Sequence, residues 1–223
     1  MYGGSVEKMS HIVIIGGHGK VALHLARILS TRGDEALSVI RNPDHTDDVA
    51  AAGATPVVAD IEDLDTDALA DLLDGHDAVV FTAGAGGGNP ARTYSVDRDA
   101  AIRVIDAAAQ AGVQRFVMVS YFGAGTDHGV SEDNSFFAYA QAKAAADAHL
   151  RASSLDWTIL GPGGLTLDPA TGRITVGPEA ADGKVSREDV AQVIAAALAD
   201  PSTIGRTIEF NNGDTPIADA ISL

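Results

Sequence analysis

Short hydrophobic runs alternate along the chain with longer segments in which hydrophobic residues recur every three to four positions. The runs have the length of β-strands, and the longer segments have the periodicity of amphipathic helices. Because the runs are hydrophobic throughout, they are typical of strands that are covered on both faces. We expect strands at residues 11–15, 36–40, 55–59, 77–82, 114–120, 157–160 and 207–210.

Helical segments follow most of these strands. Ser186 and Asp189 form a capping box that begins one of them, and Pro201 ends it. A strand followed by a helix, repeated along the chain, predicts a parallel sheet with helices on both faces. The sequence therefore predicts an α/β protein with a doubly wound, mostly parallel sheet, the Rossmann fold. We expect helices after Gly19, between Pro43 and Gly53, and over residues 66–73, 91–111, 136–152 and 190–199.

The length of 223 residues fits one large domain, and neither an internal repeat nor a linker is evident. We expect residues 1–10 to be a flexible N-terminal extension and residues 11–223 to form one domain with a small C-terminal substrate region. The longest stretch with no helical pattern is 161–185, in which residues 173–176 have the pattern of a short strand. Long loops usually have a function, so we expect substrate specificity there and at 123–135.

Composition narrows the possible functions. The chain has 15 Lys and Arg against 31 Asp and Glu, a formal charge of −16, so nucleic acid and anionic membranes are not expected partners. It has no cysteine, which excludes thiol nucleophiles, iron–sulfur clusters and disulfides. The hydrophobic runs are far shorter than the ~20 residues that span a bilayer. We expect a soluble cytoplasmic protein without a metal site that acts on a small molecule, either as a monomer or as a homodimer.

A glycine-rich turn joins the first strand to the first helix, with the sequence Gly16-Gly17-His18-Gly19-Lys20-Val21-Ala22. It reads as Gly-x-x-Gly-x-x-Ala from Gly16 or as Gly-x-Gly-x-x-Ala from Gly17. Either way, glycine permits the turn and lets a phosphate approach the positive end of the helix. A purely structural turn is the alternative, but the strand before it and the helix after it favour dinucleotide binding. His18 is expected either at the phosphate or in solvent.

The end of the second strand discriminates between NAD and NADP. An acidic residue there binds the ribose 2′-hydroxyl of NAD, whereas an arginine accepts the 2′-phosphate of NADP. This chain has Arg41 and Asn42 at that place, with no acidic residue between the strand and Pro43. The sequence therefore favours NADP, the alternative being that Arg41 is a solvated surface residue.

The third and fourth strands end in further candidate cofactor residues. Asp60 and Ile61 follow the third strand, and Asp60 is expected either to accept from the adenine amino group or to cap the next helix. Ala83 and Gly84 follow the fourth strand. Small residues at this edge of a parallel sheet let a ligand lie against the backbone.

Tyr139 and Lys143 are four positions apart in an expected helix and therefore share one face. The ammonium, together with a nicotinamide cation, would lower the pKa of the phenol towards neutrality, so that Tyr139 exchanges a proton with the substrate. The alternative is a tyrosine that packs against a lysine without any function. After a dinucleotide-binding turn, the catalytic interpretation is favoured.

Together these motifs resemble the short-chain dehydrogenase/reductase family, in particular its compact atypical group related to biliverdin reductase B and to nitrogen-metabolite-repression regulators. The resemblance extends from His11 to the C-terminal tail and also includes residues 116–120 and 160–164. It implies that Lys143 contacts the nicotinamide ribose, and that Pro162, Gly163 and Gly164 lie beside the nicotinamide. The NADP site that it implies consists of Gly16, His18, Gly19, Lys20, Val21, Arg41, Asn42, Asp60, Ile61, Ala83 and Gly84.

One feature departs from the family pattern. Family enzymes have a Ser or Thr just beyond the fifth strand that polarises the substrate carbonyl, whereas here Ser120 is followed by Tyr121 and Phe122. Ser120 is therefore either catalytic or only the end of the strand.

The function predicted by these residues is that of an NADP-dependent oxidoreductase acting on a small carbonyl or alcohol, a quinone or a flavin-like compound. The alternative is an NADP(H)-sensing regulatory protein without turnover. A sugar-nucleotide epimerase is disfavoured because little of the chain follows Ser120 to form a large substrate domain.

Overall fold

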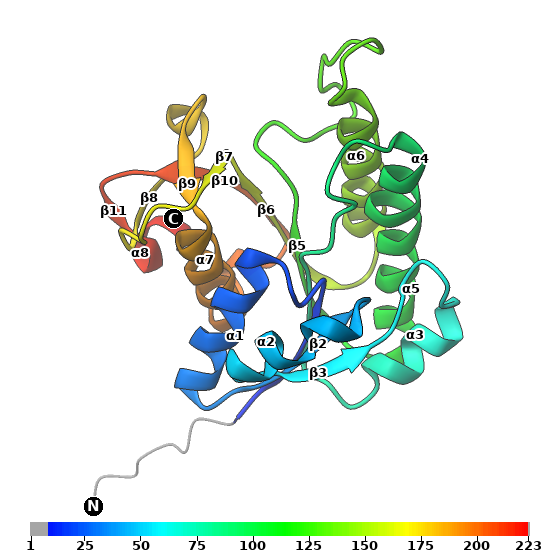
Figure 1. The fold of residues 1–223 in the computed structure, drawn as a ribbon. Helices are drawn as coiled ribbons and strands as arrows, with labels where there is room; N and C mark the ends of the chain where they lie inside the picture. Colours follow the sequence, from blue (N-terminus) through cyan, green and yellow to red (C-terminus); the bar gives the residue numbers. More distant parts are fainter. Residues whose placement is uncertain (1–8, 223) are drawn as a thin grey trace, which may run out of the picture.

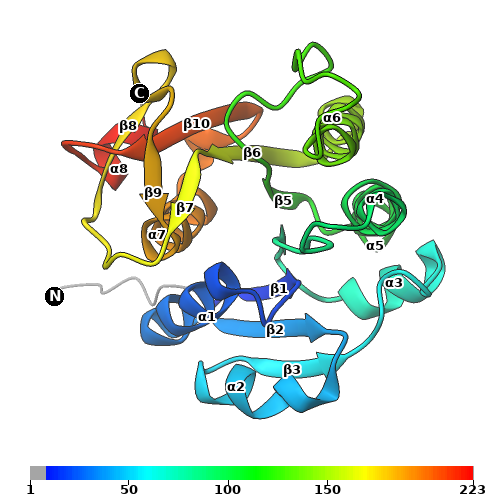
Figure 2. The same cartoon turned by 45° about the horizontal axis from the view of Figure 1, so that its top comes forward.

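The computed structural model describes residues 9–222, which form a nine-stranded sheet covered by helices on both faces (Figures 1 and 2). The strand order is β11-β8-β10-β6-β5-β4-β1-β2-β3. Every pairing from β10 to β3 is parallel, whereas β8 is antiparallel to β10 and to β11. The predicted doubly wound, mostly parallel α/β fold is thus confirmed. The extension expected at residues 1–10 lies, up to residue 8, outside the described residues.

The elements follow one another as the hydrophobic pattern predicts, and the expected strands end within two residues of the observed ones. The strands are β1 (His11–Ile15), β2 (Glu35–Ile40), β3 (Thr55–Val58), β4 (Ala78–Phe81), β5 (Arg115–Val119), β6 (Asp156–Pro162), β7 (Gly164–Thr166), β8 (Arg173–Val176), β9 (Lys184–Ser186), β10 (Arg206–Asn212) and β11 (Thr215–Pro216). The helices are α1 (Lys20–Arg32), α2 (Thr46–Ala51), α3 (Thr66–Leu73), α4 (Pro90–Thr93), α5 (Ala101–Ala111), α6 (Phe137–Ala152), α7 (Arg187–Ala199) and α8 (Ile217–Ile221). Short helical turns are η1 (Pro43–His45), η3 (Pro178–Ala180) and η4 (Pro201–Thr203), and η2 (Tyr94–Ala100) is a π-helix.

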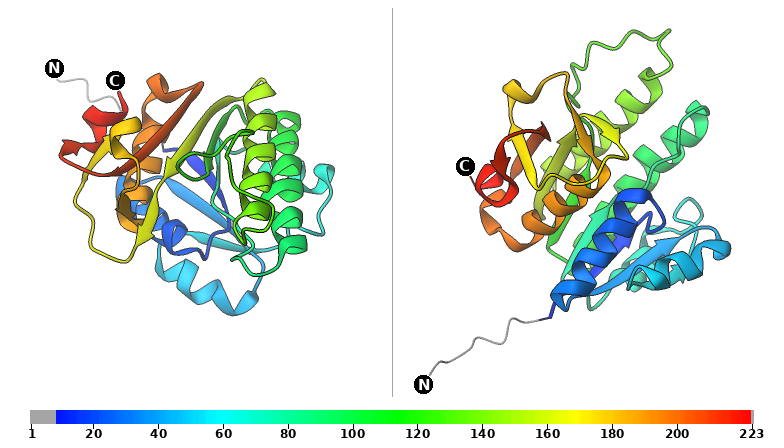
Figure 3. Two further views of the ribbon diagram at one scale, coloured as in Figure 1. Left: turned by 90° about the horizontal axis from the view of Figure 1, so that it is seen from above. Right: turned by 60° about the vertical axis from the view of Figure 1, so that its left-hand side comes forward.

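Two hydrophobic clusters, one on each face of the sheet, form the core. Ile12 and Ile14 of β1 pack in the cluster that includes α1, α2 and α7, whereas Val13 and Ile15 pack in the cluster that includes α3, α5 and α6. Figure 3 shows the two helical layers from above and from the side. The alternation along β1 explains its continuous hydrophobicity, because both of its faces are covered. None of the helices in residues 9–222 has the length and hydropathy needed to cross a membrane.

The structure differs from the sequence-based expectations in three places. The helix expected at 91–111 is divided into α4, the π-helix η2 and α5; π-helical turns are frequent at functional sites. Strands β7 and β9 form a separate two-stranded parallel sheet that the pattern did not predict. The tail after the last expected strand, 207–210, contains β11 and α8, because Ile217, Ala220 and Ile221 are buried.

Candidate active site

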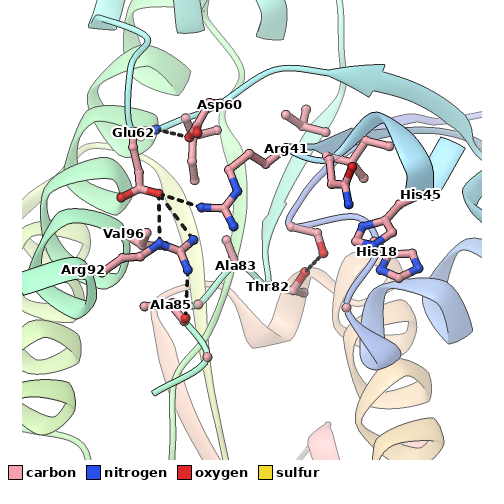
Figure 4. A pocket seen from close by; sticks show the side chains of 18 of the residues that line it. His18, Arg41, His45, Asp60, Glu62, Thr82, Ala83, Ala85, Arg92 and Val96 are labelled. Carbon is pink, nitrogen blue, oxygen red and sulfur yellow. Dashed lines mark hydrogen bonds and ion pairs between the residues drawn. The ribbon is translucent and has the colours of Figure 1, made fainter. Parts of the chain in front are cut away.

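A cavity of about 580 Å³ lies at the carboxyl edge of the sheet, where β1 to β4 end (Figure 4). The parallel strands bring the residues that follow them to this edge, as expected for the fold. Residue Tyr139 of α6 also lines the cavity, so the phosphate turn and the candidate proton donor share one space. The predicted residues that line it are Gly16, His18, Gly19, Arg41, Asn42, Asp60, Ile61, Ala83, Gly84 and Tyr139.

The first two glycines of the turn are required by packing. Gly16 has a φ of +86°, and a Cβ there would lie 2.6 Å from Cα of Ala83. A Cβ on Gly17 would overlap the side chain of Ser38. The backbone N–H groups of Gly16 and Gly17 both donate to the carbonyl of Val39, which fixes the turn against β2. The turn therefore has a structural role as well as the predicted binding role.

Gly19 has a different surrounding. Its backbone has ordinary angles, φ −56° and ψ 148°, and a Cβ there would meet only the Gly16 carbonyl, at 3.3 Å. Helix α1 begins after it with neither a side-chain cap nor an acidic residue in its first turn. The first N–H groups of a helix need a partner, and an anion supplies one. The turn thus fits the pyrophosphate of a dinucleotide. Lys20 and Val21 begin α1 outside the cavity lining.

The His18 side chain lines the cavity and contacts two other side chains. Its ring stacks on His45 with 3.5 Å between centroids, and its Nε2 lies 2.9 Å from Oδ2 of Asp48. His18 is therefore at the predicted phosphate turn and not free in solvent. His45 also lines the cavity and had no signal in the sequence.

Arg41 points into the cavity, where it meets an unexpected carboxylate (Figure 4). Its Nη1 lies 3.4 Å from Oε2 of Glu62, and Arg92 contacts the same oxygen through Nε and Nη2, each at 3.4 Å. Sequence reasoning missed Glu62 and Arg92. Glu62 lies in the loop after β3 and Arg92 in α4, and only the topology of the sheet brings them to Arg41.

Asp60 accepts from the backbone N–H of Glu62 at 3.0 Å and lines the cavity. The alternative that it caps the next helix is wrong, because Asp65 caps α3 by accepting from Ala68 N at 2.9 Å. Asp60 therefore shapes the loop that presents Glu62.

Tyr139 is half-buried on the side of α6 that faces the cavity. Its ring lies 5.6 Å from that of Tyr121 and 5.2 Å from that of Phe136. Burial, and then the nearby carboxylates of Asp97 and Asp147, raise the pKa of Tyr139 well above its usual range. The expectation that the surroundings lower this pKa is therefore wrong for the groups that the protein itself supplies. They keep the phenol protonated.

Lys143 lies one turn further along α6 and is buried, with 1% of its surface exposed. Its Nζ donates to Sδ of Met118 at 3.4 Å and lies 5.6 Å from the centre of the Phe81 ring. Burial lowers the pKa of Lys143, and the carboxylates of Asp147 and Asp97 oppose this change. Lys143 lies outside the cavity lining.

Ser120 is buried and also lies outside the cavity lining. Its hydroxyl donates to Oδ2 of the fully buried Asp147 at 2.6 Å. Burial raises the pKa of Asp147, whereas Lys143 and Ser120 lower it. Tyr139, Lys143 and Asp147 are spaced four residues apart and thus share a helix face. That spacing was the signal in the sequence that could have identified Asp147.

Asp97, in η2, binds the backbone of the loop that follows β4. Its Oδ2 accepts from Ala85 N at 3.0 Å, whereas Oδ1 is buried and has no partner. Oδ1 of Asp147 and the hydroxyl of Tyr121 are likewise buried without a partner. Unsatisfied buried polar atoms are uncommon in folded proteins, and the residues that carry these three interact electrostatically with Tyr139 or Lys143.

The segment predicted to lie beside the nicotinamide follows β6. Pro162 accepts from Phe122 N at 2.9 Å, and Gly164 begins β7. A Cβ on Gly163 would overlap the amide of the buried Asn211, so packing alone requires this glycine. Pro162, Gly163 and Gly164 do not line the cavity, and their contact with a cofactor stays a prediction.

Comparison with known proteins agrees with this geometry. A family model described as NAD(P)H-binding matches residues 16–201. The sugar epimerase YhfK of Bacillus subtilis, an uncharacterized protein, is 36% identical over 212 residues, which cover 94% of this chain and 98% of that protein. A solved Bacillus halodurans structure, described as an NAD-dependent epimerase/dehydratase, is 36% identical with a TM-score of 0.87, covering 95% and 98% of the two chains. ChuY, an anaerobillin reductase from Escherichia coli O157:H7, is 26% identical with a TM-score of 0.75, covering 92% and 98%.

Proposed function

The chain belongs to the NAD(P)H-binding family, and on this premise we propose that it is an NADP(H)-dependent oxidoreductase of the short-chain dehydrogenase/reductase type. Its substrate is a small carbonyl or alcohol, a quinone or a flavin-like compound. One observation carries the proposal: the Tyr139 side chain lines the same cavity as the glycine turn and Arg41. A dinucleotide held by its phosphates at the turn would extend along the sheet edge towards this phenol.

The cofactor, when bound, supplies the hydride, and the residues of the chain handle the proton. A general acid must hold its proton until the substrate needs it. The phenol of Tyr139 carries this proton at neutral pH, but its raised pKa makes it a weak acid until a cationic group, such as an oxidised nicotinamide, lies beside it. The buried Lys143 and Asp147 share one face of α6 with Tyr139, because the three residues are four positions apart.

The preference for NADP(H) rests on Arg41. Its guanidinium is half-exposed in the cavity, at the end of β2, where it meets the ribose of the adenosine half in this fold. Residues Ile40 to Pro43 contain no carboxylate that would favour a free 2′-hydroxyl. Guanidinium groups bind phosphate through charge-assisted hydrogen bonds, which gives Arg41 its role in discrimination.

The test is a panel of aldehydes, ketones, quinones and flavins, in which NADPH oxidation is followed by absorbance. We expect at least one compound to be reduced. Tyr139→Phe should reduce turnover by about 10²- to 10⁴-fold while NADPH affinity is kept, because only the transferable proton is lost. Tyr94→Phe is the matched control, since Tyr94 packs on Arg98 outside the cavity. Full activity of Tyr139→Phe would mean that the protein supplies no proton donor there.

An NADP(H)-sensing protein without turnover is the second candidate. The observation that favours it is Ser120, whose hydroxyl is directed to Asp147 and lies outside the cavity lining. Tight NADPH binding without reduction of any compound in the panel would support this candidate.

An epimerase is a third possible outcome, because two of the relatives bear that name. The length argument against it is weak, since the Bacillus subtilis relative is covered over 98% of its own length by this chain. An epimerase takes a hydride from its substrate onto the oxidised cofactor and returns it, so nucleotide sugars would interconvert without net oxidation or reduction of the cofactor.

A further inference from the structure

The carboxylate of Glu62 lies between two arginines that come from different parts of the chain. Arg41 follows β2, whereas Arg92 lies in α4, after the fourth-strand loop. All three residues line the cavity, and both guanidinium groups approach the same oxygen, Oε2 of Glu62, at 3.4 Å (Figure 4). The cluster therefore carries one positive charge more than it has negative charges.

The two arginines are held unequally. Arg92 meets Oε2 through two nitrogens, and its Nη1 also donates to the carbonyl of Ala85 at 3.3 Å. The backbone N–H of Arg92 donates to Oδ1 of Asn89, the N-cap of α4, at 3.2 Å. Arg41 contacts Glu62 through Nη1 alone, and 53% of its side chain is exposed against 35% for Arg92. Arg41 is thus the partner that leaves Glu62 more easily.

This asymmetry matters for a ligand that carries a phosphate. In the proposed function the 2′-phosphate of NADP(H) binds the guanidinium of Arg41, and Glu62 would compete for the same group. After Arg41 moves, the Glu62 carboxylate would face the phosphate unless another cation compensates it, and like charges at short range repel. Arg92 stays on Glu62 and provides that compensation.

We infer that Glu62 and Arg92 set the preference of this site for NADP(H) over NAD(H). Glu62 holds the Arg41 guanidinium away from the 2′-phosphate, and Arg92 weakens this hold by pairing with Glu62 itself. Both are positioning residues, because they act through Arg41. The inference rests on the proposed cofactor but does not require turnover. It concerns only how strongly the 2′-phosphate is recognised.

The experiment measures dissociation constants of NADPH and NADH at low ionic strength, where screening is weak. The readout is their ratio, since a merely structural defect changes both affinities alike. Arg92→Gln should lower the preference for NADPH by about three- to tenfold, because Arg41 then becomes the only partner of Glu62. Glu62→Gln should raise the preference by a similar factor. In the Glu62→Gln background, Arg92→Gln should change the ratio by less than about twofold, because no carboxylate is left to compensate.

Two variants control for net charge. Arg98→Gln removes a positive charge from the same helical segment, where Arg98 pairs with Asp99 outside the cavity. Asp63→Asn removes a negative charge next to Glu62 at an exposed position outside the cavity lining. Arg41→Ala is the positive control and should lower the NADPH preference most.

The outcomes separate the inference from the proposed function. If the wild-type protein binds neither NADPH nor NADH, the proposed function fails. If it binds NADPH and loses its preference in Arg41→Ala, but Arg92→Gln and Glu62→Gln change the ratio no more than Arg98→Gln and Asp63→Asn, the inference is overturned. An equal loss from Arg92→Gln with and without Glu62 would also overturn it, because Arg92 would then act on the phosphate directly.

Discussion

The two ends of the cavity are built on opposite principles. At the phosphate and adenosine end, the chain offers backbone N–H groups, a glycine turn and half-exposed charged side chains such as Arg41. At the Tyr139 end, the ionisable groups are buried: Lys143 and Asp147 have almost no exposed surface. The first end is adapted to attract an anion from water. The second end is adapted to hold a proton in a fixed place.

The difference predicts how each end responds to mutation. Exposed charges are screened by water, so changing them alters ligand affinity and leaves the fold nearly intact. Buried charges are stabilised only by each other and by hydrogen bonds, so removing one leaves its partners uncompensated. Replacing a charged residue should therefore change mainly stability at the Tyr139 end and mainly ligand binding at the phosphate end.

Replacement of Lys143 should have the largest effect on stability. Lys143→Met leaves the buried carboxylates of Asp97 and Asp147 without their cation, which should lower the free energy of unfolding by about 3–5 kcal/mol at neutral pH. Urea unfolding measures this. Lys184→Met, at an exposed lysine of β9, is the control and should change stability by less than about 0.5 kcal/mol.

The same variant makes a prediction about pH. Burial already raises the pKa values of Asp97 and Asp147, and without Lys143 they should rise further. A carboxyl group with a raised pKa in the folded state contributes stability below its unfolded pKa, about 4, and loses it as pH rises through the folded value. The deficit of Lys143→Met should therefore be smaller near pH 5 than near pH 8. A deficit independent of pH would mean that the two carboxylates do not depend on Lys143.

Two glycines of the turn should separate folding from binding. Gly16→Ala should destabilise the protein by about 2 kcal/mol or more, because its φ of +86° and the contact with Ala83 exclude a Cβ. Gly19→Ala should leave stability nearly unchanged and weaken NADPH at least about tenfold, since only the approach of the phosphate is obstructed. Thermal unfolding and NADPH titration distinguish the two. Unchanged NADPH affinity in a folded Gly19→Ala protein would mean that the phosphate does not bind at this turn.

Most of the phosphate end was predictable from the sequence, because a strand, a glycine turn and a helix are consecutive in the chain. Arg41 and Asp60 follow strand ends and were found in the same way. Glu62 and Arg92 were not, since their meeting depends on how separate loops fold over the sheet. Asp147 could have been identified from its four-residue spacing to Lys143. The hydrogen bond that it accepts from Ser120 could not, because the two residues are far apart in the sequence.

Replacement of Ser120 should have a smaller effect on stability than replacement of Lys143. Ser120→Ala removes the donor to Asp147, and the loss of a buried hydrogen bond to a charged group should lower stability by about 1.5–3 kcal/mol. Because Ser120 lies outside the cavity lining, NADPH affinity should stay within about twofold of the wild-type value. Equilibrium unfolding and NADPH titration measure the two effects. A stable variant with impaired turnover would instead identify Ser120 as catalytic.

A crystal structure of the protein with NADP⁺ tests most directly whether one cavity unites the two ends. We expect the pyrophosphate at the N-terminus of α1 beside Gly19, the 2′-phosphate at Arg41 and the nicotinamide ring next to Tyr139. A cofactor bound with its nicotinamide away from Tyr139, or bound outside this cavity, would contradict the assignment.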